Sequence, residues 1–512
     1  MRTPALALIS DYPKYYAEHT PDAEAVVTRD SRLSWQSFER SIDTCARALI
    51  ALGVERGDRV AMLSVPSAEH LIMFLATVRL GALWQGLNPR QTYAELSYLV
   101  GDSQPLVLVG IESFEGRDFT ADLQRLHDEV SAIEHLVIVG SDGLGPLLSA
   151  AEGVTEQQLE QALEHVEADD PCLLVYTSGS TGRPKGALLS HKNVVTSART
   201  QCEHWWAEPM RMLNAMPINH VGGVVQGACQ LFVAGGTNVM RERFDPGESV
   251  LVARDENITL IHGISIMYQM ILDSDEYAEF GMPSVQVLIW SGAPSPLDLI
   301  RRYREVTPNL FTSYGCTELG GEGLYMPSGA SDEQLAQFVG LPPENYEMRI
   351  DPDTKEIQAR SDAVMLGYLN RPEATAESFT EDGWLQTGDC AEIDPKTGYW
   401  RIVGRIKEMY KSGGYNIYPR EVEMVLEEHP AVAMAAVFGV PDEAYGEKGV
   451  AYLLLENGAT VDEATISAHC REQLANYKVP KVFNIETELP ILAIGKIDKA
   501  KLRELASSAP VS

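Results

Sequence analysis

The stretch of sequence that decides the fold reads LLVYTSGSTGRPKGALLSH and spans residues 173–191. Its first residues are apolar and predict a buried strand over 173–176. Residues 177–186 then hold four hydroxyl side chains, three glycines and two cations, with no acid among them. Glycines let backbone N–H groups converge on a ligand, hydroxyls donate hydrogen bonds, and cations offset negative charge. The stretch therefore predicts a strand and a loop that grips a polyphosphate, although a solvated Ser/Gly turn has a similar composition.

Two common nucleotide motifs do not match this loop. The Walker A pattern G-x-x-x-x-G-K-[ST] fails because Pro184 stands where the second glycine is required. The dinucleotide pattern G-x-G-x-x-G is not met either. A phosphate-binding role for residues 177–186 thus requires another class of enzyme.

Composition narrows the range of functions. The 512 residues exceed a single core, so two to four folding units are expected. The net charge of −32 argues against nucleic acid or an anionic membrane as a general partner, and an anionic substrate would need local cations such as Arg183 and Lys185. Seven scattered cysteines without a C-x-x-C pair favour a reducing, cytoplasmic compartment over a disulfide framework or a zinc site. The apolar segment 71–84 contains Arg79 and is not expected to span a membrane.

The pattern of elements predicts an α/β fold. Residues 20–140 alternate strand and helix patterns, which is typical of a mainly parallel sheet. Similar signals resume after the loop, and a strand expected over 286–291 runs into the sharp turn Gly292-Ala293-Pro294. In open α/β sheets ligands bind at the carboxyl ends of strands, so this turn is a candidate binding position.

The sequence changes character near Arg405. Residues 405–418 are basic and carry glycines and aromatics, and the order helix, strand, strand, helix, strand, helix follows. We therefore expect a large N-terminal domain over 1–404, built of α/β subdomains, and a small α+β domain over 405–512.

Three further clusters hold polar groups suited to chemistry. Residues 313–318 read SYGCTE, in which an aromatic beside a glycine can stack on a flat base and a carboxylate can hold Mg²⁺. Residues 387–389 read TGD and precede Gly404-Arg405, a combination that suits ribose hydroxyls. Gly495-Lys496 lies on the approach to the last helix, where a lysine can act as a point charge. Taken singly, each cluster is also common as a strand end, a turn or a surface segment.

His220 lies in an otherwise apolar stretch, residues 216–223. A hydrogen-bonded core histidine is the default interpretation of such a residue. The paired glycines beside it, Gly222 and Gly223, would instead leave room for a substrate.

In their order along the chain, these motifs resemble the adenylate-forming superfamily. That superfamily includes acyl-CoA and aryl-CoA synthetases, firefly luciferase and the adenylation domains of peptide synthetases. The resemblance rests on YTSGSTGRPKG, SGAP, SYGCTE, TGD, GRIKE, KSGGYNIYP and a late GK, runs over nearly the whole chain, and is closest in pattern to acid–CoA ligases.

The resemblance implies a site for ATP and Mg²⁺. The β- and γ-phosphates would be bound by Thr177, Ser178, Gly179, Ser180, Thr181, Gly182 and Lys185. The adenine slot would be lined by Gly292, Ala293, Ser313 and Tyr314, and Gly315 would also contact the nucleotide. Thr317 would contact the phosphates and Glu318 would hold Mg²⁺, with Thr177 as a further metal contact. Asp389 and Arg405 would bind the ribose hydroxyls.

The resemblance also implies the remaining roles. Lys496 would bridge the substrate carboxylate and the α-phosphate, and Lys407 would be the hinge between the domains. His220 would gate the passage between acid and thiol, and the pantetheine arm of CoA would meet Lys411, Gly413 and Gly414. The acid pocket would be lined by His220, Gly222, Gly223, Gly315, Gly320 and Gly321. The small size of Gly222, Gly223, Gly320 and Gly321 suggests room for an aryl or medium-to-long acyl group.

The implied reaction is ligation of a carboxylic acid to CoA through an acyl-adenylate. Three alternatives stay open: an enzyme that loads a carrier protein, a luciferase-like oxygenase, and a non-catalytic nucleotide-binding relative. Two departures from the family pattern are Ile494, where threonine is usual, and Tyr415, where glutamate is usual. The acid, the thiol acceptor and the oligomeric state, with a homodimer as one option, are not fixed by the sequence.

Overall fold

The computed structural model describes residues 3–140, 142–177, 183–412, 415–442, 445–491 and 497–508. Contacts divide the chain into two compact units. The larger comprises Met1–Glu347 and Ala359–Leu385, and the smaller comprises Met348–Gln358 and Gln386–Ser512. The change of sequence character at Arg405 thus falls inside the smaller unit, because Cys390 and Val403 before it pack in one core cluster with Tyr418 after it. A functional boundary at that residue stays a prediction.

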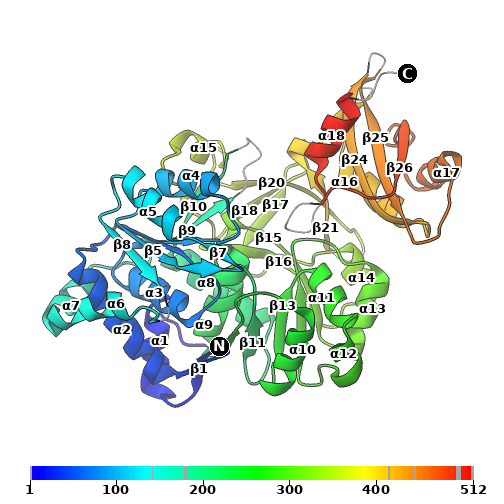
Figure 1. Cartoon of the computed structure of the whole chain (residues 1–512). Helices are drawn as coiled ribbons and strands as arrows, with labels where there is room; N and C mark the ends of the chain where they lie inside the picture. Colours follow the sequence, from blue (N-terminus) through cyan, green and yellow to red (C-terminus); the bar gives the residue numbers. More distant parts are fainter. Residues whose placement is uncertain are drawn as a thin grey trace. The chain divides into compact units, whose positions relative to one another are not determined.

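The larger unit is built on two sheets (Figure 1). In spatial order, the eight-stranded sheet contains β16 (Gly321–Tyr325), β15 (Leu310–Cys316), β14 (Val287–Trp290), β13 (Leu260–Gly263), β11 (Arg211–Asn214), β12 (Thr237–Met240), β1 (Glu24–Val27) and β2 (Arg32–Ser34). The seven-stranded sheet contains β19 (Gly367–Tyr368), β10 (Lys185–Ser190), β9 (Pro171–Thr177), β4 (Leu83–Leu87), β3 (Arg59–Leu63), β5 (Val107–Ile111) and β8 (His135–Val139).

Both sheets have parallel centres, which confirms the predicted α/β class. Adjacent strands from β1 through β12, β11, β13 and β14 to β15 run parallel, as do those from β9 through β4, β3 and β5 to β8. Antiparallel strands close the edges: β2 and β16 in the first sheet, β10 and β19 in the second. The alternating pattern of the sequence predicts the parallel strands but not these edges.

Helices cover the sheets of the larger unit (Figure 1). They are α1 (Asp11–His19), α2 (Trp35–Ala51), α3 (Ala68–Arg79), α4 (Tyr93–Ser103), α5 (Thr120–Glu129), α6 (Gly145–Leu148), α7 (Glu156–Leu163), α8 (His191–His204), α9 (Gln230–Ala234), α10 (Pro246–Asp255), α11 (Ser265–Leu272), α12 (Asp275–Phe280), α13 (Leu297–Val306), α14 (Asp332–Gln337) and α15 (Pro372–Ala376).

Local sequence explains two of the predicted helices. In α2, the Ser34 side chain accepts a hydrogen bond from the Ser37 N–H at the amino end, and Trp35, Phe38 and Ile42 are buried at helical spacing. The second is α3, the apolar helix that contains Arg79. It is buried on nearly every side, as expected for a core helix. Within the described ranges, none of the helices combines the length and apolarity that a bilayer crossing requires.

The smaller unit contains two further sheets (Figure 1). The first has the order β17 (Glu347–Ile350), β18 (Glu356–Arg360), β20 (Leu385–Ile393) and β21 (Trp400–Arg405). The second has the order β23 (Tyr415–Ile417), β22 (Tyr410–Ser412), β25 (Gly446–Leu455) and β24 (Val432–Asp442), with β26 (Val482–Glu486) paired to β25. Its helices are α16 (Pro419–Glu427), α17 (Glu463–Gln473) and α18 (Lys499–Ser508).

The second sheet of the smaller unit buries both of its faces. Alternate residues of β24 enter different cores: Ala435 and Val437 pack with residues of α16 and α17, whereas Ala436 and Phe438 pack with Leu502 of α18. This period of two is the expected pattern of a strand buried on both sides. The order of elements after residue 418 agrees with the α+β pattern predicted from sequence.

Candidate functional site

The phosphate-loop motif begins and ends on two paired strands. Strands β9 and β10 are antiparallel, and Thr177 stands opposite Lys185 where they meet the loop. The Thr177 hydroxyl donates to the Lys185 carbonyl at 3.4 Å. The predicted strand is confirmed by β9. The central residues of the motif, Ser178, Gly179, Ser180, Thr181 and Gly182, lie outside the described residues, so their role stays a prediction.

Tyrosine rings lie against both cations of the motif. The Lys185 ammonium is 4.1 Å from the centre of the Tyr368 ring, and the Arg183 guanidinium carbon is 5.6 Å from the centre of the Tyr98 ring. The Tyr98 hydroxyl also donates to the Pro184 carbonyl at 2.8 Å. Cation–π contacts of this kind hold a charge in place without neutralising it.

Tyr368 connects this loop to a second motif. Its hydroxyl donates to Glu318 Oε1 at 2.7 Å, and its strand β19 pairs with β10 beyond the loop. Burial raises the pKa of the Tyr368 phenol, and the neighbouring Glu318 carboxylate raises it further, so the hydroxyl stays a donor. The structure thus brings Glu318 and Lys185, two predicted site residues, to one tyrosine. Sequence reasoning missed Tyr368 because a two-residue strand has no readable period.

The predicted adenine-binding residues lie on or directly after two neighbouring strands of the eight-stranded sheet. Strands β14 and β15 are parallel neighbours in which Trp290 is paired with Thr312. Gly292 and Ala293 follow the end of β14 and are exposed, whereas Ser313 and Tyr314 continue β15 and are buried. Gly292 has a φ of +80°, a conformation that glycine adopts without strain, and open space lies where a Cβ would be.

Thr317 and Glu318 begin the short helix η3 (Thr317–Leu319), which directly follows β15. Thr317 is buried and Glu318 is partly exposed. No group of three or more His, Cys, Asp or Glu side chains suited to a metal ion occurs in the part of the chain that the structure describes. A divalent cation at Glu318 would therefore take most of its ligands from a bound phosphate compound and water, as Mg²⁺ commonly does.

His220 is exposed, so the default interpretation as a core histidine does not hold. It precedes the π-helix η2 (Gly222–Cys229), which is buried throughout. The Gly222 N–H donates to His220 Nδ1 at 3.2 Å, which leaves Nε2 as the protonated nitrogen of the neutral ring. Widened helical turns of this kind are frequent at functional sites.

The glycines predicted to line the acid pocket have a packing reason to be small. A Cβ at Gly223 would collide with the Pro217 carbonyl, and one at Gly320 would come within 2.6 Å of the Ala363 oxygen. A Cβ at Gly315 would collide with the backbone of Gly321. Their size therefore reflects close backbone approach and does not indicate a roomy pocket. Whether these residues contact the acid stays a prediction.

A buried carboxyl group, Glu322 on β16, was not anticipated from the sequence. Gln226 of the π-helix donates to Glu322 Oε1 at 2.5 Å, whereas Oε2 has no hydrogen-bond partner among the described residues. Burial raises the pKa of Glu322 to about 7, against the opposing effect of Ser313, Ser291 and Gln226. Glu322 stands between Gly321 and Gly323 in the sequence, and this local pattern does not indicate that its side chain is buried.

In the smaller unit, the predicted ribose-binding residues contact each other. Asp389 and Arg405 are paired across β20 and β21, and Arg405 Nε donates to Asp389 Oδ1 at 2.7 Å. The Asp389 side chain is buried and that of Arg405 is 60% exposed. The Asp389 N–H donates to the Thr387 hydroxyl at 3.2 Å, which accounts for the TGD turn. A carboxylate oriented by an exposed cation is suited to accept hydrogen bonds from a diol.

The other predicted residues of the smaller unit are only partly described. Lys407 lies in the short helix η4 (Ile406–Glu408) and is exposed, and Lys411 is exposed on β22. The Lys411 N–H donates to Glu447 Oε2 at 2.9 Å. Gly413, Gly414 and Lys496 lie outside the described residues. Tyr415, at the position where glutamate is usual, stacks on Tyr477 with ring centres 4.2 Å apart.

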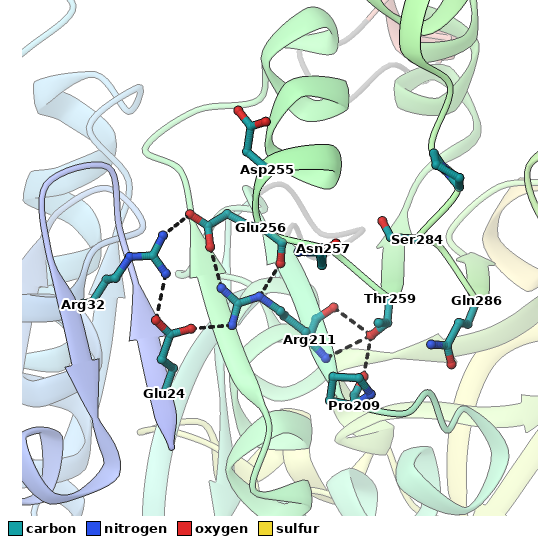
Figure 2. Close-up of a pocket in the computed structure, with 11 residues that line it drawn as sticks. Glu24, Arg32, Pro209, Arg211, Asp255, Glu256, Asn257, Thr259, Ser284 and Gln286 are labelled. Atoms are coloured by element: carbon teal, nitrogen blue, oxygen red, sulfur yellow. Dashed lines mark hydrogen bonds and ion pairs between the residues drawn. The ribbon is translucent and has the colours of Figure 1, made fainter. Parts of the chain in front are cut away.

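A pocket of about 660 Å³ opens at the amino ends of β1 and β11 in the eight-stranded sheet (Figure 2). It is lined by Glu24 and Arg211, the first residues of the parallel strands β1 and β11, whereas Gly292 follows the last residue of β14. Two arginines and two glutamates form a closed ring in it: Arg32 and Arg211 each pair with both Glu24 and Glu256. Because these charges neutralise one another, we interpret this pocket as structural.

Comparisons with known proteins agree with the resemblance seen in the sequence. A family model described as AMP-binding enzyme matches residues 14–369, and one described as AMP-binding enzyme C-terminal domain matches residues 421–496. A feruloyl-CoA synthase from Amycolatopsis sp is 34% identical over 514 residues, covering 97% of this chain and 98% of that protein.

Two further relatives extend over the same length. A 3-[(3aS,4S,7aS)-7a-methyl-1,5-dioxo-octahydro-1H-inden-4-yl]propanoyl:CoA ligase from Mycobacterium tuberculosis is 34% identical over 496 residues, covering 95% of this chain and 96% of that protein. The crystal structure of ATP-bound MatB from Rhodopseudomonas palustris has a TM-score of 0.85 at 29% identity, covering 98% of this chain and 99% of that one. From its two domain models and these relatives, the chain belongs to the AMP-binding enzyme family.

Proposed function

We propose that this AMP-forming acid–CoA ligase activates a carboxylic acid as its acyl-adenylate and then transfers the acyl group to the thiol of CoA. The observation that carries the proposal is the double contact of Tyr368, with the Lys185 ammonium and with the Glu318 carboxylate. It holds the base of a polyphosphate loop beside a carboxylate suited to a divalent cation. Both groups would serve one substrate, a nucleoside triphosphate with its metal ion.

In the first step, an oxygen of the acid attacks the α-phosphorus of ATP. A new P–O bond forms, the bond to the β-phosphate oxygen breaks, and pyrophosphate leaves. Two anions must meet, so the barrier falls when fixed positive charge lies where negative charge accumulates. We assign this role to Lys185 and Lys496. No covalent enzyme intermediate is needed, in agreement with the lack of a G-x-S-x-G nucleophile motif in the sequence.

The remaining contacts to ATP follow the predicted set. Glu318 would hold Mg²⁺ together with phosphate oxygens, Thr177 would contact it, and the ion would neutralise phosphate charge. Asp389 and Arg405 would bind the ribose. The adenine and adjoining phosphates would be bound by Gly292, Ala293, Ser313, Tyr314, Gly315 and Thr317, and the loop contacts would come from Ser178, Gly179, Ser180, Thr181 and Gly182.

In the second step, the sulfur of the CoA thiol attacks the acyl carbonyl carbon and a C–S bond forms. The C–O bond to the α-phosphate breaks, its electron pair leaves on AMP, and the thiol proton is released to solvent. We propose that the smaller unit turns about Lys407 between the steps, so that Lys496 withdraws and the Lys411, Gly413 and Gly414 face replaces it. His220 would gate the passage of the thiol to the acid.

The acid itself is proposed to carry an aryl or other bulky body, or a medium-to-long acyl chain. The exposed His220 at the start of the π-helix supports a pocket entrance there. The names of the two ligase relatives, one for ferulate and one for a bicyclic propanoate, support a bulky acid. None of the seven cysteines is in a disulfide, which supports a reducing cytoplasmic location, and a homodimer is testable by light scattering.

The test is acid-dependent release of pyrophosphate from ATP and Mg²⁺, measured over benzoates, hydroxycinnamates and medium- and long-chain fatty acids. Release with at least one of these classes, followed by a CoA thioester, is the expected result. Release followed by transfer only to a phosphopantetheinyl carrier protein would favour the carrier-loading alternative. Nucleotide binding without release by any acid would contradict the proposal and favour a sensor.

A further inference from the structure

A buried ion-pair cluster ties three segments of the smaller unit together. Lys499 Nζ lies 2.8 Å from Glu408 Oε2 and 2.7 Å from Glu423 Oε1. Glu408 ends η4, which contains the proposed hinge residue Lys407, and Glu423 lies on α16. The Lys499 side chain is 18% exposed and that of Glu423 is 4% exposed. Glu423 Oε1 also accepts the Val437 N–H at 2.8 Å, which fixes it to strand β24.

Lys499 occupies an unfavourable position for a cation. It is the first residue of α18, where the helix dipole and the unpaired N–H groups favour negative charge. Burial acts to lower the pKa of Lys499, but the attraction of Glu423 and Glu408 outweighs it and raises the pKa, so the ammonium stays charged. A helix start that needed only stability would not require a desolvated lysine with two carboxylates.

The chain around Lys499 is fixed on both sides of the proposed catalytic lysine. Ile491 bridges Ile497, and the Asp498 N–H donates to the Pro490 carbonyl at 2.8 Å. The Asp498 side chain accepts the Lys501 N–H at 3.0 Å and so caps α18. Residues 490–491 and 497–499 therefore anchor the two ends of the segment that contains Lys496, and the Lys499 ion pairs are the contact that reaches Glu408, beside Lys407.

We propose that Lys499 is a positioning residue for adenylation. Its ion pairs with Glu408 and Glu423 fix the first turn of α18, which directly follows the segment that contains Lys496. The inference rests on the proposed function, because it takes Lys496 as the group that neutralises the reacting anions. A lysine that must reach one point in the transition state loses its effect when its base shifts by about 1 Å. The thiol-transfer step is proposed to use Lys411, which lies on β22, and does not need this anchor.

The test replaces Lys499 with methionine, which keeps the apolar stem and removes the charge. We expect Lys499→Met to lower kcat for acid-dependent pyrophosphate release about ten- to a hundredfold, with KM for ATP and acid nearly unchanged. Thioester formation from supplied acyl-adenylate should stay within about twofold, and Lys499→Arg should recover most of the first step. Lys501→Met, an exposed position on the same helix, is the matched control.

Amide hydrogen exchange provides a readout that does not depend on activity. The amides of residues 497–499, read from overlapping peptides, should exchange about tenfold faster in Lys499→Met than in the wild type or in Lys501→Met. If the wild type released no pyrophosphate with any acid, the proposed function would fail while this measurement still judged the anchor. Equal loss of both half-reactions, or unchanged exchange and unchanged kcat, would overturn the assignment. If Lys499→Met does not fold, Glu408→Gln is judged by the same split between half-reactions.

Discussion

At the scale of single residues, Tyr368 is the contact that joins two motifs of the site. Its hydroxyl hydrogen-bonds Glu318 and its ring lies under Lys185. Tyr368→Phe removes only the hydroxyl, so the ring contact and the packing should remain. We expect the Mg²⁺ concentration for half-maximal pyrophosphate release to rise about three- to tenfold, from loss of roughly 1 kcal/mol in orienting Glu318.

The control for this change is Tyr98→Phe, which removes a hydroxyl that donates to the Pro184 backbone carbonyl. That variant should leave the Mg²⁺ requirement near the wild-type value. An unchanged Mg²⁺ requirement in Tyr368→Phe, with normal folding, would show that Glu318 is oriented without Tyr368.

Glu322 predicts a dependence of stability on pH. Burial raises the pKa of Glu322 from the ordinary glutamate value of 4.5 to about 7, so the folded state binds a proton that the unfolded state has lost between those values. Stability should therefore fall as pH rises from about 5 to about 7.5, by an amount on the order of 1–3 kcal/mol. Glu322→Gln, which cannot ionise, should flatten this part of the stability profile in urea unfolding.

The stability profiles of Glu322→Gln and the wild type are compared by the same urea unfolding measurement. Glu392→Gln is the control, because the pKa of Glu392 is lowered: burial would raise it, but Lys355 and Arg401 outweigh that effect. Its contribution is lost only in acid, below the pH range of interest. Parallel profiles for wild type and Glu322→Gln between pH 5 and 7.5 would refute the role given to Glu322.

At the scale of elements, the ring of two arginines and two glutamates fastens strands β1 and β2 to β11 and the carboxyl end of α10. Arg211, whose side chain is 12% exposed, contacts both glutamates. Arg211→Ala should lower the free energy of unfolding by about 1–3 kcal/mol, because it leaves Glu24 and Glu256 without their better buried partner. Urea unfolding measures this change.

Arg29→Ala is a suitable control, because Arg29 is 69% exposed and its pair with Glu248 should contribute little. Both half-reactions should be unaffected in either variant at temperatures where the protein is folded. A loss of pyrophosphate release in Arg211→Ala without loss of stability would show that this pocket has a part in catalysis.

The elements also show what the sequence can and cannot predict. The strands expected over 173–176 and 286–291 are found as β9 and β14, because a buried strand of a mainly parallel sheet is a continuous apolar run. The edge strand β19 and the four-stranded sheet of the smaller unit were not predicted, because their residues alternate irregularly and pair with distant segments. Tyr368 and Glu322 share this cause: each acquires its partners only through such pairing.

At the scale of the whole molecule, the two proposed steps should be separable by mutation. Lys496→Ala should lower the rate of adenylation about a hundredfold or more. It should leave thioester formation from supplied acyl-adenylate largely intact. Lys411→Ala should have the opposite bias. Pyrophosphate release and CoA-thioester formation, assayed separately, measure the two effects.

Equal loss of both steps in Lys496→Ala would contradict the assigned division of roles, and a purely adenylation defect in Lys411→Ala would remove that residue from the thiol face. Lys448→Ala, which breaks a partly exposed pair with Asp442 on the neighbouring strands, is the control for nonspecific damage to the smaller unit. The sequence motifs suffice to predict this division. The anchoring of Lys499 depends on packing that no local pattern records.

The cysteines of this chain have a practical consequence. Six of the seven are buried, whereas Cys316 is partly exposed and directly precedes Thr317 and Glu318. Burial raises the pKa of the Cys45 thiol to about 12, which makes such side chains slow to alkylate in the native state. A maleimide dye should therefore modify Cys316 first, and ATP with Mg²⁺ should protect it. Protection of this kind would make Cys316 a reporter of nucleotide occupancy, and mass spectrometry of tryptic peptides would identify the labelled thiol.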